Sequence, residues 1–324
     1  MKLCVTGGAG YVGSVVAEML QAGGHQVVVF DNLSTGHRDA VPGGCAFVEG
    51  DVRDAGALAR ALEGVDAVLH FAALSVVAES MRRPLEYFDN NVSGTTSLVR
   101  AMQTHGVRRL VFSSTAAVYG TPARLPIEED APCSPENPYG WSKLTVEWML
   151  AAMHAAWGLE YVALRYFNAA GASDACGEDH RPESHLIPIV LEAALGRREA
   201  VTVFGDDYPT RDGTCVRDYV HVSDLARAHV LALDAMAGGF SGSLNLGSQT
   251  GFTVREVIEA TRRVTGRDVK TVAGERRPGD PPSLVASSQR AGQVLGWTAT
   301  HSDLDTIIGS ALAWHEKYPR GYHA

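Results

Sequence analysis

The sequence lacks the features that define two large classes of protein. Among its 324 residues there is no uncharged apolar run of about 18 residues, which a membrane-spanning helix needs. Acidic residues outnumber basic ones, and the formal net charge of -9 argues against a general nucleic-acid binder, which would carry a basic patch. A membrane protein is therefore excluded, and we expect no nucleic-acid partner.

Cysteine is also scarce. The five cysteines are scattered and show no CxxC spacing, so they indicate neither a disulfide framework nor a zinc site: Cys4, Cys45, Cys133, Cys176 and Cys215. No charged segment followed by a long apolar one precedes Leu3, so no secretory signal is indicated. We therefore expect a protein of the reducing cytoplasm with no metal.

The N-terminal residues predict a strand, a glycine-rich turn and a helix. Residues 3–6 are a short buried strand, glycines follow at 7, 10 and 13, and residues 14–21 are compatible with a helix. Glycine lets the backbone turn sharply and approach a pyrophosphate, whose charge the helix N-terminus stabilises. Gly7, Gly10 and Gly13 therefore predict a dinucleotide site, with a purely structural turn as the alternative.

The next strand strengthens this interpretation. Residues 26–30 end at Asp31, which lies 18 residues after Gly13 and near the spacing expected of the carboxylate that binds an adenosine ribose. A carboxylate at this point repels a 2′-phosphate, so NAD is preferred to NADP. Arg38 is the nearby basic residue that would favour NADP.

Further strands at residues 46–48 and 65–70 alternate with helical segments, which predicts a parallel, doubly wound sheet. Asp51 follows the third strand and either accepts the adenine amino group or caps the helix at 55–62, a role that Asp54 could also fill. Asn90 and Asn91 are polar where a helix should pack on the sheet. One of them either contacts the cofactor or binds a loop backbone.

The chemistry is expected between residues 112 and 143. The strand at 109–113 places Thr115 at its carboxyl end, where ligands bind in open α/β sheets. Tyr139 and Lys143 fall on one face if Tyr139 opens a helix. Ionising a tyrosine at pH 7 costs roughly 4 kcal/mol, and a cation about 4 Å away returns on the order of 4 kcal/mol. We expect Lys143 by itself to make Tyr139 a base, with coincidental spacing as the alternative.

The helix predicted at 139–157 has two apolar stripes, and one helix turns only one face to its own sheet. The first stripe is Trp141, Leu144, Trp148 and Ala152, and the second is Val146, Met149, Met153 and Trp157. The second stripe is a candidate homodimer surface, or else another part of the chain covers it. After a strand at 161–166 the chain becomes irregular. We place a boundary between a first domain at 1–170, which about 218–247 could rejoin, and a second at 171–324.

The residues resemble the extended short-chain dehydrogenase/reductases and, within that family, the UDP-glucose (UDP-galactose) 4-epimerases. The resemblance covers nearly the whole chain. Its most specific stretches are Thr6-Gly-Gly-Ala-Gly-Tyr-Val-Gly13, Asp31-Asn-Leu33, Pro84-Leu-Glu-Tyr-Phe-Asp-Asn-Asn-Val92, Tyr139-Gly-Trp-Ser-Lys143, Arg165-Tyr-Phe-Asn168, Phe204-Gly-Asp-Asp-Tyr-Pro-Thr210 and Asp212-Gly-Thr-Cys-Val-Arg-Asp-Tyr-Val-His-Val222.

The resemblance implies a Rossmann domain with a smaller α+β substrate domain. It also implies NAD-dependent inversion at C4 of a UDP-hexose through a transient 4-keto sugar, with hydride returned to the opposite face. Thr115, Tyr139 and Lys143 are the implied catalytic residues. The implied NAD contacts are Gly7, Gly10, Tyr11, Val12, Gly13, Asp31, Asn32, Asp51, Val52, Phe71, Ala72, Ala73, Asn90, Tyr139, Lys143 and Tyr166. The implied substrate contacts are Thr115, Asn168, His185, Leu186, Phe204, Arg217, Arg277 and Asp280.

Four positions depart from many members of that family. Ser75 stands where many members have Lys, and Ala73 stands where many have Gly. One branch of the family has Tyr at the position of Leu284 and Asn at the position of His185. Ser75 removes one expected cofactor contact, and the smaller Leu284 leaves room for a 2-acetamido sugar. The alternatives are 4-epimerases of UDP-N-acetylglucosamine, UDP-glucuronate or UDP-xylose, and more remotely a catalytically silent dinucleotide sensor.

Overall fold

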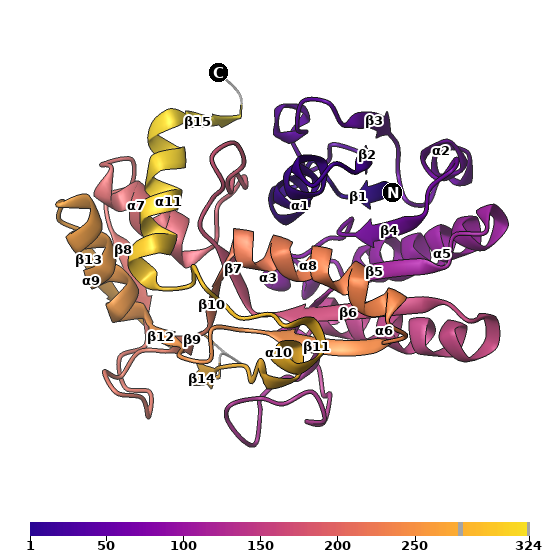
Figure 1. Cartoon of the computed structure of the whole chain (residues 1–324). Helices are drawn as coiled ribbons and strands as arrows, with labels where there is room; N and C mark the ends of the chain where they lie inside the picture. Colours follow the sequence, from indigo (N-terminus) through magenta and orange to yellow (C-terminus); the bar gives the residue numbers. More distant parts are fainter. Residues whose placement is uncertain (278–280, 323–324) are drawn as a thin grey trace.

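The computed structural model describes residues 1–277 and 281–322, and a parallel sheet organises most of them (Figure 1). In the described part of the chain this sheet has seven strands, in the order β11-β6-β5-β4-β1-β2-β3. Their bounds are β1 Lys2–Thr6, β2 Gln26–Asp31, β3 Ala46–Glu49, β4 Ala67–His70, β5 Arg109–Thr115, β6 Glu160–Tyr166 and β11 Gly242–Leu246. The predicted doubly wound parallel sheet is confirmed.

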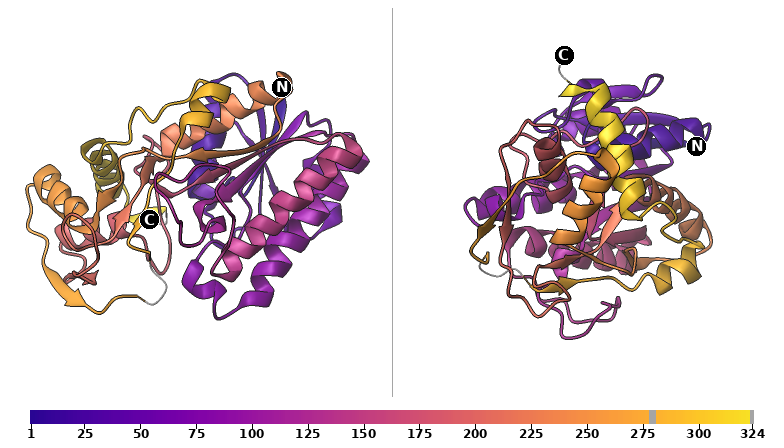
Figure 2. Two further views of the ribbon diagram at one scale, coloured as in Figure 1. Left: turned by 90° about the horizontal axis from the view of Figure 1, so that it is seen from below. Right: turned by 90° about the vertical axis from the view of Figure 1, so that its left-hand side faces the viewer.

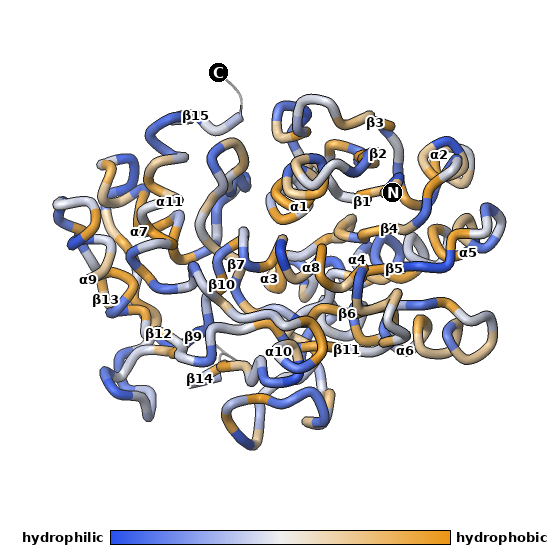
Figure 3. The backbone as a smooth tube through the Cα atoms, in the orientation of Figure 1, coloured by the Kyte–Doolittle hydropathy of each residue, from blue (hydrophilic) through white to orange (hydrophobic). Residues whose placement is uncertain are grey.

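Helices cover both faces of the sheet, as the left panel of Figure 2 shows. Their bounds are α1 Tyr11–Ala22, α2 Ala55–Ala61, α5 Gly94–His105, α6 Pro138–Trp157, α8 Val222–Ala237 and α10 Gln289–Leu295. Apolar strand residues form one core with α1, α8 and α10, and a second core with α2, α5 and α6. The apolar stretches of β4 and β5 stand out in Figure 3. Burial on both faces explains why these strands are apolar runs rather than alternating ones.

The order of the strands determines where a ligand can bind. β1 pairs with β2 on one side and with β4 on the other, because the chain crosses over after β3. In open α/β sheets, ligands bind at the carboxyl ends of the strands where the winding direction reverses. Here that point is the carboxyl end of β1 and β4, directly after Thr6 and His70.

Residues 219–246 return to the large sheet. β10 (Tyr219–His221) pairs with β7 (Asn168–Ala170), α8 packs on α1, and β11 lies parallel to β6 with Gly242 opposite Val162. The last strand of the large sheet thus comes from sequence that follows about 50 residues of the smaller region, an order that strand propensities alone do not reveal.

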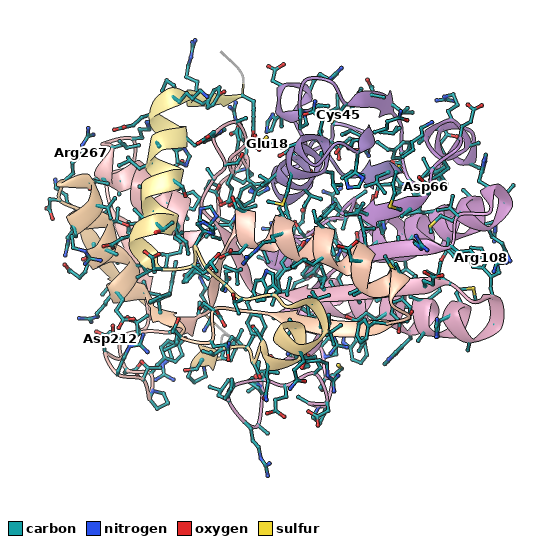
Figure 4. All side chains as sticks on the ribbon, viewed as in Figure 1. Glu18, Cys45, Asp66, Arg108, Asp212 and Arg267 are labelled. Atoms are coloured by element: carbon teal, nitrogen blue, oxygen red, sulfur yellow. The ribbon has the colours of Figure 1, made fainter. Side chains whose placement is uncertain are left out.

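The smaller region lies at the carboxyl edge of the large sheet (Figure 1). Its elements are α7 Leu186–Ala194, β8 Val201–Phe204, β9 Val216–Arg217, β12 Phe252–Thr253, α9 Val254–Thr265, β13 Thr271–Gly274, β14 Ser283–Leu284, α11 Leu304–Lys317 and β15 Pro319–Tyr322. Helices α7, α9 and α11 share an apolar core. Figure 4 places Asp212 and Arg267 on this region and Asp66 and Arg108, which precede β4 and β5, at the opposite edge of the sheet.

Two details concern the helices of the second core. Two short helices, α3 (Val77–Ser80) and α4 (Pro84–Phe88), precede α5, and a π-helical turn (Asp89–Ser93) joins α4 to α5. The second stripe of α6 is covered by the same chain: Val146 is fully buried, and Met149, Met153 and Trp157 pack against the core that α6 shares with α5. Among the described residues, no helix combines the length and apolar composition that a membrane span needs.

Candidate active site

A cavity of about 1310 Å³ runs along the carboxyl edge of the large sheet. Its wall comes from the turns after β1, β2, β4 and β5, from the start of α6, and from α7, β8, β9 and β14 of the smaller region. Sites for single small molecules typically measure about 300–1,000 Å³, so this cavity has room for two ligands. All of the expected site residues line it except Asp51 and Asp280, and Asp280 lies outside the described residues.

The glycine turn is shaped by close backbone contacts. Gly7 has a φ of 72°, and a Cβ there would lie 2.5 Å from the backbone nitrogen of Ala72. A Cβ on Gly13 would lie 2.2 Å from the carbonyl oxygen of Gly7. Helix α1 follows with no side-chain cap and no acidic residue in its first turn. Its free N–H groups therefore remain available to an anion in the cavity, as a pyrophosphate requires.

Asp31 is held at the end of β2 by the backbone. Its carboxylate accepts hydrogen bonds from the N–H groups of Ala9 at 3.0 Å and Leu33 at 2.8 Å. Burial raises the pKa of this carboxyl, and the backbone hydrogen bonds partly oppose that rise. Arg38 does not line the cavity, because its guanidinium stacks on the ring of Phe47 at 4.3 Å. The residues present thus fit a dinucleotide without a 2′-phosphate.

The structure decides whether Asp51 caps helix α2. Asp54 caps α2 by accepting from Gly56 and Ala57, so the capping role proposed for Asp51 is wrong. Asp51 instead receives hydrogen bonds from Arg53 and Asn32, and the Arg53 guanidinium holds the pKa of Asp51 well below its usual range.

Of the two asparagines, Asn91 takes the role of binding a loop backbone. The Asn91 amide exchanges two hydrogen bonds with the backbone of Leu74 and donates to the Ser142 hydroxyl at 2.9 Å. Asn91 thus ties the loop after β4 to α6, whereas Asn90 lines the cavity.

Tyr139 reaches the cavity because the start of α6 packs tightly on the turn after β5. Asn137 caps the helix, Pro138 is its first residue, and Gly140 faces the carbonyl oxygen of Ala117, which a Cβ would approach to 2.5 Å. Any larger side chain at residue 140 would push the helix away. This packing brings the Thr115 hydroxyl close enough to the Tyr139 phenol to lower the pKa of the phenol.

The electrostatics around Tyr139 differ from expectation. Burial raises the pKa of Tyr139 to about 12, although the hydrogen bond from Thr115 lowers it in part. Lys143 donates to the Ser113 carbonyl at 2.8 Å, and its Nζ lies 5.9 Å from the centre of the Tyr139 ring. Burial also lowers the pKa of Lys143 to about 7, against the opposing field of Glu147. The prediction that Lys143 alone makes Tyr139 a base is therefore wrong for the protein without cofactor.

The smaller region contributes the far wall. The Arg277 guanidinium stacks on the Phe204 ring at 4.1 Å, and Arg217 lies on β9 with its side chain at the cavity. Asn168 donates to the Asp218 carbonyl at 2.9 Å, which fixes its amide at the start of β7. His185 and Leu186 stand at the N-terminal end of α7. The two arginines therefore belong to one wall although 60 residues separate them in the sequence.

Some residues of the site were not expected. The Ser113 hydroxyl bonds to the phenol of Tyr166, and Glu147 forms a buried ion pair with Arg165 beneath Lys143. Glu178, His180 and Glu183 also line the cavity. The repeated Glu-X-His spacing of residues 178–180 and 183–185 was a signal in the sequence that a search for cysteine ligands does not register.

The cavity brings together the Thr115 and Tyr139 hydroxyls, the Lys143 amine and the glycine turn that could bind a dinucleotide. Ala116 and Ala117 follow Thr115 and both line the cavity. Elimination from a neighbouring carbon needs an acid and a base there, and these methyl side chains supply neither. The site is suited to removing and returning a proton at one oxygen.

Comparison with known proteins gives consistent results. The model of the NAD dependent epimerase/dehydratase family matches residues 3–247. A UDP-glucose 4-epimerase of Streptomyces lividans is 53% identical over 324 residues, covering 99% of this chain and 98% of that protein. The structure of a UDP-glucose 4-epimerase from Brucella ovis in complex with NAD superposes with a TM-score of 0.93 at 48% identity, covering 96% of this chain and 97% of that one.

A third similar protein is the UDP-glucose 4-epimerase of Bifidobacterium longum, whose structure is in complex with NAD+ and UDP. It has a TM-score of 0.92 at 38% identity and covers 99% of this chain and 100% of that one. These full-length similarities agree with the glycine turn after β1 and with the Thr115–Tyr139 pair. The chain therefore belongs to the NAD-dependent epimerase/dehydratase family.

Proposed function

We propose that the protein is a UDP-glucose 4-epimerase, which interconverts UDP-galactose and UDP-glucose with NAD as its bound cofactor. The single observation that carries this proposal is the Thr115–Tyr139 hydroxyl pair, which shares a cavity with the glycine cradle while Ala116 and Ala117 replace any acid or base beside it. Such a site can oxidise and reduce one carbon but has no acid–base pair directly after Thr115 to eliminate water from the neighbouring carbon. Full-length similarity to UDP-glucose 4-epimerases supports the choice of sugar nucleotide.

Tyr139 is the group that moves the proton. It takes the proton of the sugar 4-hydroxyl and later returns it to the same oxygen, while the Thr115 hydroxyl holds that oxygen by a hydrogen bond. When bound, NAD supplies reversible hydride exchange with C4 of the sugar and a positive charge near the phenol. Because burial raises the pKa of Tyr139 to about 12, this added positive charge is what makes the phenolate accessible at neutral pH.

The remaining contacts bind and orient the ligands. Asp31 and Asn32 would hold the adenosine ribose and the N-terminus of α1 the pyrophosphate of the dinucleotide, with Val52, Phe71, Ala72, Ala73, Asn90 and Tyr166 around it. Arg217 and Arg277 would hold the diphosphate of the substrate, since a guanidinium fork matches phosphate oxygens. A fixed nucleotide with a free sugar lets one tyrosine serve both faces of C4, because the 4-keto sugar turns over between the two transfers.

A panel of UDP-sugars tests the substrate. The protein is incubated separately with UDP-glucose, UDP-galactose, UDP-N-acetylglucosamine, UDP-glucuronate and UDP-xylose, and both epimers and any released NADH are measured. We expect interconversion of the first two without net NADH. Selective turnover of another sugar would assign the protein to that epimerase, and silence on the whole panel with NAD bound would indicate a dinucleotide sensor.

We also infer a homodimer, a cytoplasmic location and a division of labour in which residues 1–170 with 218–247 hold NAD and the remainder holds the UDP-sugar. All five cysteines have free thiols, which fits a reducing compartment. Large apolar side chains are exposed just after α3, on α4 and on α6, three helices that contact one another: Met81 (61%), Leu85 (82%) and Trp148 (59%), with Trp141 on the same face of α6. We propose a second copy of the chain as the occupant of this face, because isologous dimers bury such self-complementary patches.

Light scattering coupled to gel filtration tests the dimer. Trp148→Glu places a charge in the proposed interface and should yield monomers, whereas Val272→Glu, at an exposed apolar residue of the smaller region, should leave the dimer unchanged. Monomeric wild-type protein at micromolar concentration would contradict the proposal.

A further inference from the structure

Two Glu-X-His units lie in one segment beside the substrate wall of the cavity. Glu178, His180, Glu183 and His185 each offer one ligand atom, and these four atoms lie within 4.8 Å of one another. The residues belong to the segment 171–185 between β7 and α7, in which the structure has neither helix nor strand. A segment of this length without secondary structure needs side-chain ties to keep one conformation.

The distances inside the cluster are hydrogen-bond distances, somewhat shorter than those between neighbouring ligands of one metal ion. The Nδ1 atom of His185 lies 2.8 Å from the Oε1 atom of Glu178 and 2.8 Å from the Oε1 atom of Glu183. The Nδ1 atom of His180 lies 3.1 Å from the same Glu178 oxygen. With metal–ligand bonds of about 2.0–2.2 Å, neighbouring ligands of a tetrahedral zinc ion stand about 3.4 Å apart, so small movements suffice to admit an ion.

The negative charge of Glu178 and Glu183 also favours a bound cation. The side chains of Glu178 and Glu183 are each only 7% exposed, and two buried carboxylates need positive charge close by. Among residues 1–277 and 281–322, the ion-pair partners of these two carboxylates are His180 and His185. His185 Nδ1 is shared between the two carboxylates, and the Glu183 Oε1 atom also accepts from the backbone N–H groups of Ser184 and His185 at 2.7 Å. One divalent cation in place of the shared proton would neutralise both carboxylates and leave the imidazoles neutral.

We propose that Glu178, His180, Glu183 and His185 form a tetrahedral Zn²⁺ site that fixes the 171–185 segment against the N-terminus of α7. Two imidazoles and two carboxylates, without sulfur, suit zinc among the common divalent metals. Four protein ligands close the coordination shell, so the ion acts on structure rather than as a Lewis acid. Its effect on the site is to hold the wall that carries His185 and Leu186. The expectation of no metal rested on cysteine spacing, and this donor set contains no cysteine.

The test uses the full-length chain without a histidine tag. Protein is stripped with EDTA, titrated with ZnCl₂ alone, and assayed for bound zinc by mass spectrometry and for melting temperature. Cobalt substituted for zinc reports tetrahedral geometry through its visible absorption. The variants are His180→Gln and Glu183→Gln, and the matched control is His105→Gln, an exposed histidine at the end of α5.

We expect one zinc per wild-type chain, a tetrahedral cobalt spectrum and a zinc-dependent rise in melting temperature. The two variants should bind zinc at least about 100-fold more weakly, because even an outer-shell partner of a metal site is typically worth about 10–100-fold. His105→Gln should match the wild type. Equal zinc content in wild type and both variants, or no zinc on the wild type at micromolar free metal, would overturn the site. Melting curves of the EDTA-treated proteins establish that each variant folds, and the two variants test the site independently.

Discussion

Lys143 and Tyr139 share one face of α6, yet the lysine donates its hydrogen bond to the Ser113 carbonyl at 2.8 Å and lies 5.9 Å from the centre of the tyrosine ring. Lys143 is buried and Tyr139 is partly buried, and burial disfavours both charged forms: it raises the pKa of Tyr139 to about 12 and lowers that of Lys143 to about 7. Burial therefore disfavours a phenolate–ammonium ion pair between these two residues.

Removal of the phenol should abolish most turnover. Tyr139→Phe keeps the ring and the packing of α6 but deletes the proton-transfer group, so we expect kcat to fall by about 10²–10⁴, the usual contribution of a positioned acid–base group. Epimer ratios followed over time provide the measurement, and absorbance of bound NAD checks occupancy. Tyr318→Phe, outside the cavity, is the control. Near-normal turnover of Tyr139→Phe with NAD bound would contradict the mechanism.

The buried lysine should make stability depend on pH. Between pH 7 and 10.5 native Lys143 has lost its proton while the unfolded chain still binds it, so the free energy of unfolding rises with pH through this window. Lys143→Met removes that contribution. We expect its stability relative to wild type to be most favourable below pH 7 and to decline towards pH 10.5.

Urea unfolding of the NAD-free proteins at a series of pH values measures this difference. The lost hydrogen bond to Ser113 shifts the variant by a constant amount, so the slope with pH is the diagnostic quantity. A difference that does not change between pH 7 and 10.5 would show that Lys143 has an ordinary pKa in the folded chain.

Arg277 should contribute to nucleotide affinity. A charge-assisted hydrogen bond is worth about 1.5–3 kcal/mol, so Arg277→Ala should weaken UDP binding by roughly 10- to 150-fold. Arg277→Lys keeps the charge but loses the planar guanidinium fork, so its dissociation constant for UDP should lie between those of the wild type and Arg277→Ala. Calorimetric titration with UDP gives the dissociation constants. The exposed Arg267→Ala on the smaller region serves as the control for net charge (Figure 4). An unchanged dissociation constant for Arg277→Ala would remove the residue from the substrate site.

Leu284 should influence which sugars enter. It is half-buried on β14 and lines the cavity, where a tyrosine would occupy more of the sugar space. Leu284→Tyr is therefore expected to suppress turnover of UDP-N-acetylglucosamine while preserving that of UDP-glucose. Leu284→Met, of similar volume, should leave both rates within a few-fold of wild type. Refusal of UDP-N-acetylglucosamine by the wild-type protein would contradict this role.

Features with a local physical cause were predictable from the sequence. Gly7 and Gly13 stand where neighbouring backbone atoms leave no room for a Cβ atom. Asp31 is the last residue of the next strand. Tyr139 and Lys143 share a face because helical geometry imposes it. For the N-cap of α2 the sequence offered two candidates, Asp51 and Asp54, and Asp54 is the residue that caps the helix.

What the sequence by itself determined, then, is the alternation of strands and helices, the glycine turn after β1 and the placement of Tyr139 and Lys143 on one helix face, because neighbours within a few residues decide these. The tertiary structure alone decided the pKa values of that pair, the packing of the second α6 stripe against the second core, and the approach of Glu178 and His185. Burial and distance set a pKa or an ion pair, and both depend on which distant segments pack together. Lys143 shows the difference: helical spacing puts it on the same face as Tyr139, but burial in the packed core lowers its pKa to about 7.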